Sequence, residues 1–309
     1  MSRLRVAVIG VGHLGKHHAR ILSSMPGVEL AGVVDTNMKR ATEVGAEYGA
    51  RPMLDVRELD GKVDAVTIAV PTEIHREIAV PFLAKGIPAL VEKPLARSLA
   101  EADDIIAAAA ASGSQLAVGH TERFNPAVAV AAEHLEDPRF IEVHRLGVFP
   151  ERSLDIDVVF DVMIHDLDVI LSVVKSDVTS IDAVGVPVLT DKFDIASVRL
   201  RFANGCMANL TASRISRDRV RKIRFFQPQA YLSIDYAAQK VEKYTLDRIL
   251  GIPKINGGEL EVTHEEPLAR ELADFVDAVT TKRKPLVDGE QGRRALALAD
   301  RISSTMTTV

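Results

Sequence analysis

The first third of the chain alternates between two hydrophobic patterns. Short continuous apolar runs are separated by longer stretches in which apolar residues recur every three or four positions. The runs are typical of buried parallel strands and the longer stretches of amphipathic helices, so their alternation predicts a doubly wound α/β sheet. The expected strands are Leu4–Gly10, Glu29–Asp35, Ala65–Val70, Ala89–Glu92 and Leu116–Val118, and the expected helices are Leu14–Ser24, Met38–Tyr48, Ile74–Lys85 and Leu99–Ala111.

After about residue 122 apolar and polar residues alternate one by one, with turn signals such as Asn204-Gly205 between the runs. This pattern predicts a mostly antiparallel sheet with helices on one face. The expected strands are Thr179–Val188, Ser197–Phe202, Cys206–Ser213, Lys222–Phe226 and Tyr231–Asp235, and the expected closing helices are Pro267–Thr280 and Glu290–Ser304. We therefore expect an N-terminal doubly wound domain over residues 1–122 and an α+β domain over residues 123–309.

The stretch FDVMIHDLDVI, residues 160–170, combines an apolar helical face with a polar stripe. Asp161, His165, Asp168 and Ser172 recur at helical spacing, whereas Asp166 falls off this stripe. Asp161 and His165 lie one turn apart, so the carboxylate can orient the imidazole. A solvated polar face, a metal site and a general base with its partner all fit this stretch, and it leaves the three alternatives open.

Composition and charge narrow the classes of protein. The 309 residues are 47% apolar and 26% charged, as in a globular protein with room for two cores. The net charge of −5 argues against nucleic-acid and membrane-surface binding. A single cysteine, Cys206, excludes an intramolecular disulfide and fits a reducing cytoplasm. The chain starts directly with a strand and its longest apolar run, residues 105–111, is short, so we expect neither a signal peptide nor a membrane span.

The segment GVGHLG ends the first expected strand and opens the first expected helix. Its Gly10, Gly12 and Gly15 have the G-x-G-x-x-G spacing that lets backbone N–H groups approach a pyrophosphate. Asp35 ends the second strand, where a carboxylate binds the ribose hydroxyls and repels a 2′-phosphate, so NAD is favoured. Lys39 and Arg40 keep NADP as an alternative.

Glu92-Lys93-Pro94 lies at the end of the expected strand Ala89–Glu92, at the edge where doubly wound sheets bind ligands. A lysine there can hydrogen-bond a substrate hydroxyl and stabilise an alkoxide. A solvated strand end is the simpler alternative.

The segments GVGHLG, AVPTEIH, VEKPLA, ERFNP and DVMIHDLD occur in this order and together resemble the Gfo/Idh/MocA family of nicotinamide-dependent oxidoreductases. The resemblance implies a Rossmann domain, an open-faced α+β domain and hydride transfer at a cleft between them. It also implies that Lys93, Asp161 and His165 form the catalytic set, with His165 as general base. Because hydride transfer needs no Lewis acid, we expect no metal.

The cofactor and substrate residues follow from these motifs. The expected cofactor-binding residues are Gly10, Gly12, His13, Leu14, Gly15, Asp35, Val70, Pro71, His75, Glu92 and Lys93. Six cations and one acid lie between Arg214 and Arg224, which suits a phosphate-bearing substrate or, alternatively, an exposed sheet edge. The expected substrate-binding residues are Arg123, Arg152, Asp161, His165 and Arg214.

Two segments, GHTERFNP and DIDVVFDVMIHDLD, are most similar to the branch of this family that oxidises the 3-hydroxyl of UDP-N-acetylglucosamine to a ketone, which an aminotransferase can convert to an amine for lipid A. Met163 stands where many family members have glycine, so the specificity of sugar or inositol members does not transfer directly. The alternatives are a dehydrogenase of a free sugar, inositol or related polyol, and a non-catalytic NAD-binding regulatory protein. An open sheet face would favour a homo-oligomer.

Overall fold

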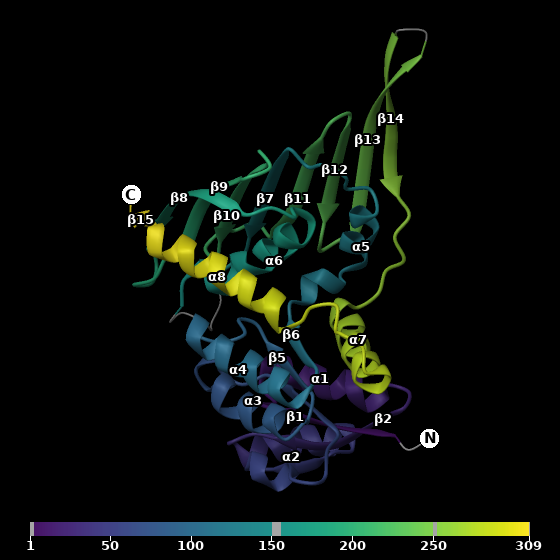
Figure 1. The fold of residues 1–309 in the computed structure, drawn as a ribbon, viewed down its shortest axis with the longest axis vertical. Helices are drawn as coiled ribbons and strands as arrows, with labels where there is room; N and C mark the ends of the chain where they lie inside the picture. The colour runs from purple at the N-terminus through teal and green to yellow at the C-terminus, as the bar shows by residue number, and fades with distance from the viewer. Residues whose placement is uncertain (1–2, 150–155, 250–251, 309) are drawn as a thin grey trace. The chain divides into compact units, whose positions relative to one another are not determined.

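The computed structural model describes residues 3–149, 156–249 and 252–308, and these form two compact units (Figure 1). The first unit contains Met1–His120 together with Leu268–Leu296. The second contains Thr121–Pro267 and Ala297–Val309. The first change of unit falls close to the predicted boundary, but the return of residues 268–296 to the first unit differs from the two contiguous ranges expected from the sequence.

The first unit is built on a parallel sheet, which confirms the predicted doubly wound fold. In the described residues its six strands have the order β3-β2-β1-β4-β5-β6, and every neighbouring pair is parallel. The strands are β1 (Leu4–Ile9), β2 (Val28–Val34), β3 (Arg51–Met53), β4 (Ala65–Ile68), β5 (Ala89–Glu92) and β6 (Leu116–Gly119). The strand order reverses beside β1, and ligands of such sheets bind at the carboxyl ends next to a reversal.

Helices connect these strands, and their ends follow the local sequence. They are α1 (His13–Ser24), α2 (Met38–Tyr48), α3 (His75–Ala84) and α4 (Leu99–Ser112), with short 3₁₀ segments η1 (Val56–Leu59) and η2 (Thr72–Ile74). Asn37 and Ser98 cap α2 and α4 by accepting backbone N–H groups, and Gly49 and Gly113 end these helices in the left-handed conformation. The predicted bounds of these four helices differ from the observed ones by at most one residue, and the caps of α2 and α4 give the physical reason for their ends.

Helix α7 (Pro267–Thr281) completes the core of the first unit. Its Leu268, Leu272 and Phe275 are buried in the same apolar cluster as Val6 and Val8 of β1. The next helix, α8 (Gly289–Thr305), begins against β6, where a Cβ at Gly292 would lie 2.7 Å from Val118. The apolar stripe of α7 is therefore buried against strands that lie far away in sequence. This packing explains why residues 268–296 belong to the first unit.

The second unit is built on a large, mostly antiparallel sheet. Across the described ranges it has nine strands in the order β14-β13-β12-β11-β7-β10-β9-β8-β15, with parallel pairs at β7–β10 and β8–β15. The strands are β7 (Phe140–Leu146), β8 (Val178–Val186), β9 (Ile195–Phe202), β10 (Met207–Ser213), β11 (Val220–Gln227), β12 (Ala230–Asp235), β13 (Lys240–Ile249), β14 (Ile252–Leu260) and β15 (Thr307–Thr308). The sheet is as predicted in type, but β7, β13, β14 and β15 were not expected from the sequence.

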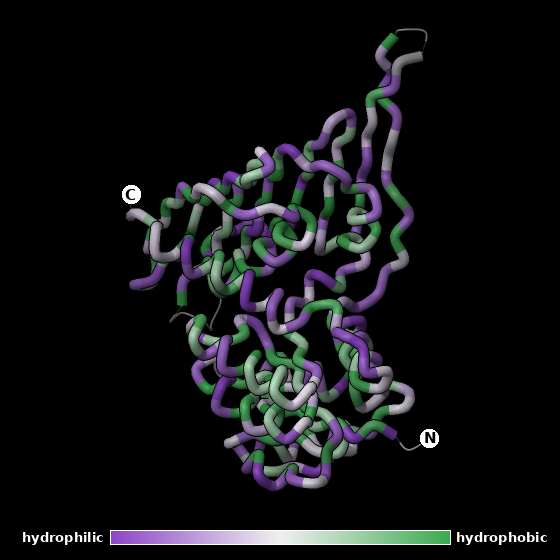
Figure 2. The backbone as a smooth tube through the Cα atoms, in the orientation of Figure 1, coloured by the Kyte–Doolittle hydropathy of each residue, from purple (hydrophilic) through white to green (hydrophobic). Residues whose placement is uncertain are grey.

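One face of this sheet is buried and the other is polar. Along β9, Ala196, Val198 and Leu200 are buried whereas Ser197 and Arg199 between them are not. Hydrophobic and hydrophilic residues alternate along the strands in Figure 2, and α5 (Pro126–Ala132) and α6 (Ile164–Val173) lie on one face in Figure 1. Within the described ranges, no helix has the length and apolar character needed to cross a membrane.

The packing of α7 gives a direct test. Leu272→Ala removes a fully buried side chain, so we expect the free energy of unfolding to fall by about 2–5 kcal/mol. Leu286→Ala is the matched control, because Leu286 is 47% exposed and its loss leaves no buried cavity. Chemical denaturation of both variants measures the difference. Equal stability of the two variants would contradict the placement of α7 in the core of the first unit.

Candidate active site

The turn between β1 and α1 leaves no space for side chains at two of its glycines. Gly10 has φ +82°, and a Cβ there would lie 2.7 Å from the Ala69 carbonyl oxygen. A Cβ at Gly15 would lie 1.8 Å from the carbonyl oxygen of Gly10. At Gly12, by contrast, no described atom comes within 4 Å of a Cβ, and no described side chain caps the start of α1 there. The turn is tight and its helix N-terminus is open, as a pyrophosphate site requires.

Asp35 is held by backbone groups at the carboxyl edge of the parallel sheet. It is 7% exposed and accepts the Val11 and Asn37 N–H groups at 3.1 and 2.9 Å. The Arg40 guanidinium lies 3.2 Å from the same carboxylate. Lys39 lies instead 4.0 Å from Glu43 on α2. Of the two predicted cations, Arg40 is therefore the one that pairs with Asp35.

His75 contacts both the end of β4 and the loop that begins with Glu92-Lys93-Pro94, called the E-K-P loop below. Its Nε2 lies 3.0 Å from the Val70 carbonyl oxygen, and its Nδ1 lies 3.1 Å from that of Pro94. The ring is 1% exposed, and this burial lowers the pKa of His75. The ring of the predicted cofactor-binding residue His75 thus lies between the end of β4 and the loop, and its neutral form donates its one N–H to an oxygen on one of these two sides.

The Lys93–Pro94 peptide bond in the loop after β5 is cis. Glu92, at the end of β5, is 5% exposed and accepts the Lys93 N–H at 3.2 Å. Its other carboxylate oxygen lies 3.0 Å from Nε2 of the fully buried His18 on α1. Glu92 was predicted to bind the cofactor, but the structure gives its carboxylate protein partners. Sequence reasoning missed His18, whose one signal was a polar residue on the apolar face of α1.

The helix that carries Asp161 and His165 begins with a π-helical segment, η4 (Val159–Met163), in which the Ile164 N–H donates to the Val159 carbonyl. π-Helical turns are frequent at functional sites because they change where the following side chains point. Asp161 lies in this segment and His165 lies in the first turn of α6, and both are half-buried.

Asp166, which the helical stripe excluded, makes the principal ion pair of this helix. It accepts Nε and Nη2 of Arg145 on β7 at 2.5 and 3.0 Å, and Glu122 accepts Nη1 at 2.9 Å. Burial alone would lower the pKa of Arg145, but the two carboxylates raise it above its ordinary value. The guanidinium also lies 4.9 Å from the centre of the Tyr236 ring. This buried cluster fixes α6 on the sheet and so determines where His165 lies.

The predicted substrate arginines have different surroundings. Arg123 lies in η3 (Thr121–Phe124) and pairs with Asp168 at 3.3 Å, with 12% of its side chain exposed. Arg214 is 2% exposed and lies 2.8 Å from Asp194, and its guanidinium also donates to the Ile156 carbonyl and to Thr190. Arg214 therefore has a structural role that requires no substrate. Arg152 lies outside the described residues.

The predicted residues divide between the two units. Gly10, Asp35, His75 and Lys93 belong to the first unit, where they occupy the carboxyl edge of the parallel sheet. Asp161, His165, Arg123 and Arg214 belong to the second. The first unit thus contains the elements of a dinucleotide site, and the second presents a histidine beside an aspartate on a firmly anchored helix.

Comparisons with known proteins agree with this division. Residues 4–120 match the oxidoreductase family with an NAD-binding Rossmann fold, and residues 129–230 match the GFO/IDH/MocA C-terminal domain. The chain is 39% identical over 302 residues to UDP-N-acetylglucosamine 3-dehydrogenase of Acidithiobacillus ferrooxidans, which covers 97% of this chain and 96% of that protein. A solved structure of UDP-N-acetylglucosamine 3-dehydrogenase from the same organism superposes with a TM-score of 0.92 at 37% identity, over 99% of this chain and 98% of that one.

A more distant relative shares a smaller part of the chain. Inositol 2-dehydrogenase of Arthrobacter sp. is 33% identical over 189 residues, which is 58% of this chain and 56% of that protein. The structure of levoglucosan dehydrogenase in complex with NADH has a TM-score of 0.88 over 98% of this chain and 97% of that one. The identity is 18%, so this likeness shows a common fold only. With both domains matched and a relative that spans nearly its whole length, the chain belongs to the Gfo/Idh/MocA family of NAD-binding oxidoreductases.

Proposed function

We propose that this oxidoreductase oxidises the 3-hydroxyl of UDP-N-acetylglucosamine to a ketone, with NAD as the hydride acceptor. The observation that carries the proposal is the 39% identity over 97% of the chain to the Acidithiobacillus ferrooxidans enzyme of that name. A second candidate, oxidation of a free polyol, is favoured by the inositol 2-dehydrogenases, but the match to the Arthrobacter protein covers 58% of the chain. The longer match makes the nucleotide sugar the first choice.

In this proposal His165 is the general base. It takes the proton of the sugar hydroxyl, and Lys93 donates a hydrogen bond to the oxygen as negative charge develops on it. Bound NAD supplies the hydride acceptor. The buried pairing of Asp166 with Arg145 supports the role of His165, because it anchors the helix turn that carries the imidazole.

Asp161 is the proposed orienting partner of His165. Asp168 lies on the same helical stripe and is the other aspartate that could take this role. In the structure Asp168 is buried and lies 3.3 Å from the Arg123 guanidinium, which provides a structural reason for this carboxylate. The half-buried Asp161 is therefore preferred for the orienting role.

The cofactor is proposed to bind at the carboxyl edge of the parallel sheet. The N–H groups at the start of α1 would hold the pyrophosphate, next to the open space at Gly12. Asp35 would accept the hydroxyls of the adenosine ribose. Val70 and Pro71, at the end of β4, would line the site together with Lys93.

Arginines remain the proposed ligands of the substrate's diphosphate. Arg123 keeps a partly exposed guanidinium, and Arg217 and Arg219 are exposed beyond the end of β10. Arg224 and Lys222 already pair with Glu142 and Asp235 across the sheet. Arg217 and Arg219, near the strand end, are therefore preferred over Lys222 and Arg224 of β11 as ligands of the diphosphate.

We also propose a cytoplasmic homo-oligomer that associates through the polar face of the large sheet. Four aromatic side chains form a row on this face, and the centres of successive rings lie 5.2–6.2 Å apart. Two of them, Phe226 and Tyr244, are at least 36% exposed. The row consists of Phe140, Phe226, Tyr231 and Tyr244. In the proposed reaction, the ketone product would be a substrate for an aminotransferase on the route to lipid A.

Substrate and lysine can be tested together. Purified protein with NAD should form NADH with UDP-N-acetylglucosamine and much more slowly with free glucose or myo-inositol. Lys93→Met should lower turnover by about two orders of magnitude or more, because it removes one transition-state donor. Lys85→Met, at an exposed lysine paired with Asp60, is the control and should keep normal turnover. NADH formation with myo-inositol alone, or full turnover by Lys93→Met, would contradict the proposal.

Asp35 should determine the choice between NAD and NADP. Asp35→Ala removes the charge that repels a 2′-phosphate and releases Arg40 from its ion pair, so the ratio of NADP to NAD affinity should rise by about tenfold or more. Fluorescence titration with both reduced cofactors measures this ratio. The double variant Asp35→Ala/Arg40→Ala is the control and should gain less NADP affinity. Unchanged relative affinities in Asp35→Ala would place the ribose elsewhere.

His165→Asn should lower turnover by about 10²–10⁴, the usual contribution of a general base, with little change in NAD affinity. It should also remove the acidic limb of the pH–rate profile, which reports protonation of the base. His264→Asn, at an exposed histidine of the same unit, is the control and should keep that limb. If the limb persists unchanged in His165→Asn, another group is the base.

A further inference from the structure

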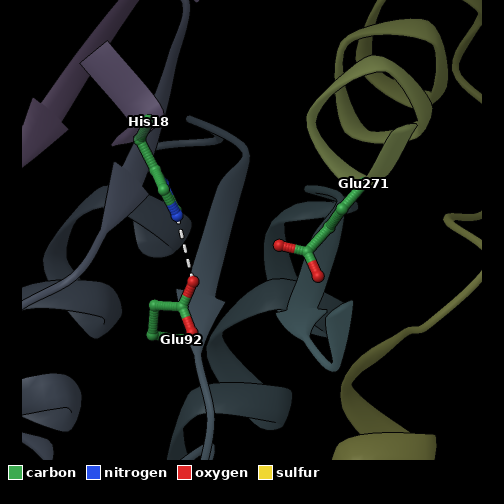
Figure 3. Close-up of side chains that lie close together, drawn as sticks. All are labelled: His18, Glu92 and Glu271. Atoms are coloured by element: carbon green, nitrogen blue, oxygen red, sulfur yellow. Dashed lines mark hydrogen bonds and ion pairs between the residues drawn. The ribbon is translucent and has the colours of Figure 1, made fainter. Parts of the chain in front are cut away.

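Three buried residues from distant parts of the chain lie close together (Figure 3). In the part of the chain that the structure describes, potential ligand atoms of His18, Glu92 and Glu271 all lie within 4.8 Å of one another. They come from α1, β5 and α7 and are at most 5% exposed. Buried ionisable groups cost free energy unless they are hydrogen-bonded or bind an ion, so their convergence requires a reason.

Both oxygens of the Glu92 carboxylate have defined partners. Oε1 lies 3.0 Å from His18 Nε2, and Oε2 accepts the backbone N–H of Lys93 at 3.2 Å. A Cβ at residue 119 on the neighbouring strand would lie 2.7 Å from Oε2, so Gly119 provides the space that the carboxylate occupies. The carboxylate is therefore a fixed link between α1 and the first peptide group of the loop.

The environment of His18 indicates which nitrogen carries its proton. Nδ1 is buried, and within the described ranges it has no hydrogen-bond partner. A proton on Nδ1 would thus be a buried donor without an acceptor, whereas a proton on Nε2 is donated to Glu92. The same observation argues against a metal ion on Nε2, because metal-bound histidines donate their other N–H to an acceptor.

The loop is also held on its other side. His75 directs Nδ1 to the carbonyl oxygens of Pro94 and Leu95 at 3.1 and 3.3 Å. Lys93 therefore lies between two buried histidines, His18 acting through Glu92 before it and His75 acting on the residues after it. Such a double attachment restricts the backbone of Lys93 more than either contact alone.

We propose that His18 is a positioning residue for the reaction, which donates its Nε2 proton to Glu92 and through that carboxylate holds the Lys93 backbone. Glu271, from α7, is the third member of the cluster and takes no part in the proposed holding of the Lys93 backbone. The inference rests on the proposed catalytic role of Lys93. A misplacement of a catalytic group by about 1 Å can cost about 10²-fold in rate.

Two amide substitutions of His18 provide the test. In His18→Gln the side-chain amide nitrogen can reach the position of Nε2, whereas in His18→Asn it is one methylene shorter and cannot. We expect His18→Asn to lower kcat by about 10–100-fold with NAD affinity within threefold of the wild type, and His18→Gln to restore kcat to within about fivefold. His17→Gln and His17→Asn are matched controls at the exposed neighbouring histidine and should leave kcat unchanged.

The two proposals can fail separately. Full turnover by Lys93→Met would overturn the role of the lysine itself, whereas loss in Lys93→Met with normal kcat in His18→Asn would overturn the role of His18 alone. Equal losses in His18→Asn and His18→Gln would also overturn it, since they would indicate packing instead of a donated hydrogen bond. If His18→Asn does not fold, Glu92→Gln replaces it, and normal kcat in Glu92→Gln overturns the proposal.

Metal analysis supplies the remaining outcome. Purified wild-type protein should contain no stoichiometric zinc or manganese by plasma mass spectrometry, and Glu271→Gln should keep kcat within about threefold because Glu271 is not the hydrogen-bond donor. One equivalent of metal that is lost in Glu271→Gln would show a His-Glu-Glu metal site and overturn the proposal.

Discussion

Buried charged groups need partners, and this requirement organises both units of the protein. A carboxylate or guanidinium removed from water costs several kcal/mol unless hydrogen bonds or opposite charges replace its hydration. In the first unit, Glu92 meets this requirement with His18 and the Lys93 backbone. In the second, Asp194 accepts the N–H groups of residues 188–190 and the Arg214 guanidinium, which hold the pKa of its carboxyl well below the ordinary range against the effect of burial.

The same requirement explains why residues of the family motifs bind other residues of the protein and support its structure. In the ERFNP segment, Glu122 binds Arg145 and Arg123 binds Asp168. Asn125 caps α5 and also donates to the Tyr236 carbonyl. These contacts connect the start of the second unit to the helix that carries His165. A motif of polar residues can therefore identify a family through the site that it supports, without each residue touching a ligand.

The proposed reaction uses the side chains of Lys93 and His165, and neighbouring contacts hold the backbone at both residues. Lys93 follows a carboxylate fixed on both oxygens, and His165 precedes the buried Asp166. Rigid support of this kind reduces the reorganisation needed when charge develops on a substrate oxygen. In the proposed function, binding of the substrate's diphosphate depends instead on exposed groups such as Arg217 and Arg219.

The sequence by itself determined the features that depend on local pattern: the alternation of strands and helices, the glycine turn, Asp35 and Lys93 at strand ends, and the family. It missed β3 and β15, which have three and two residues. It missed β7 because Arg145 lies on the buried face of this strand and Phe140 and Leu146 on the less buried one, and it missed β13 and β14 because most of their described positions are exposed or half-exposed. Only the tertiary structure decided that α7 joins the first unit, that His18 reaches Glu92 across 74 residues, and that Asp166 and Arg214 are buried in ion pairs. Each of these is a choice of partner between distant residues, and local periodicity contains no record of which side chains the folded chain brings together.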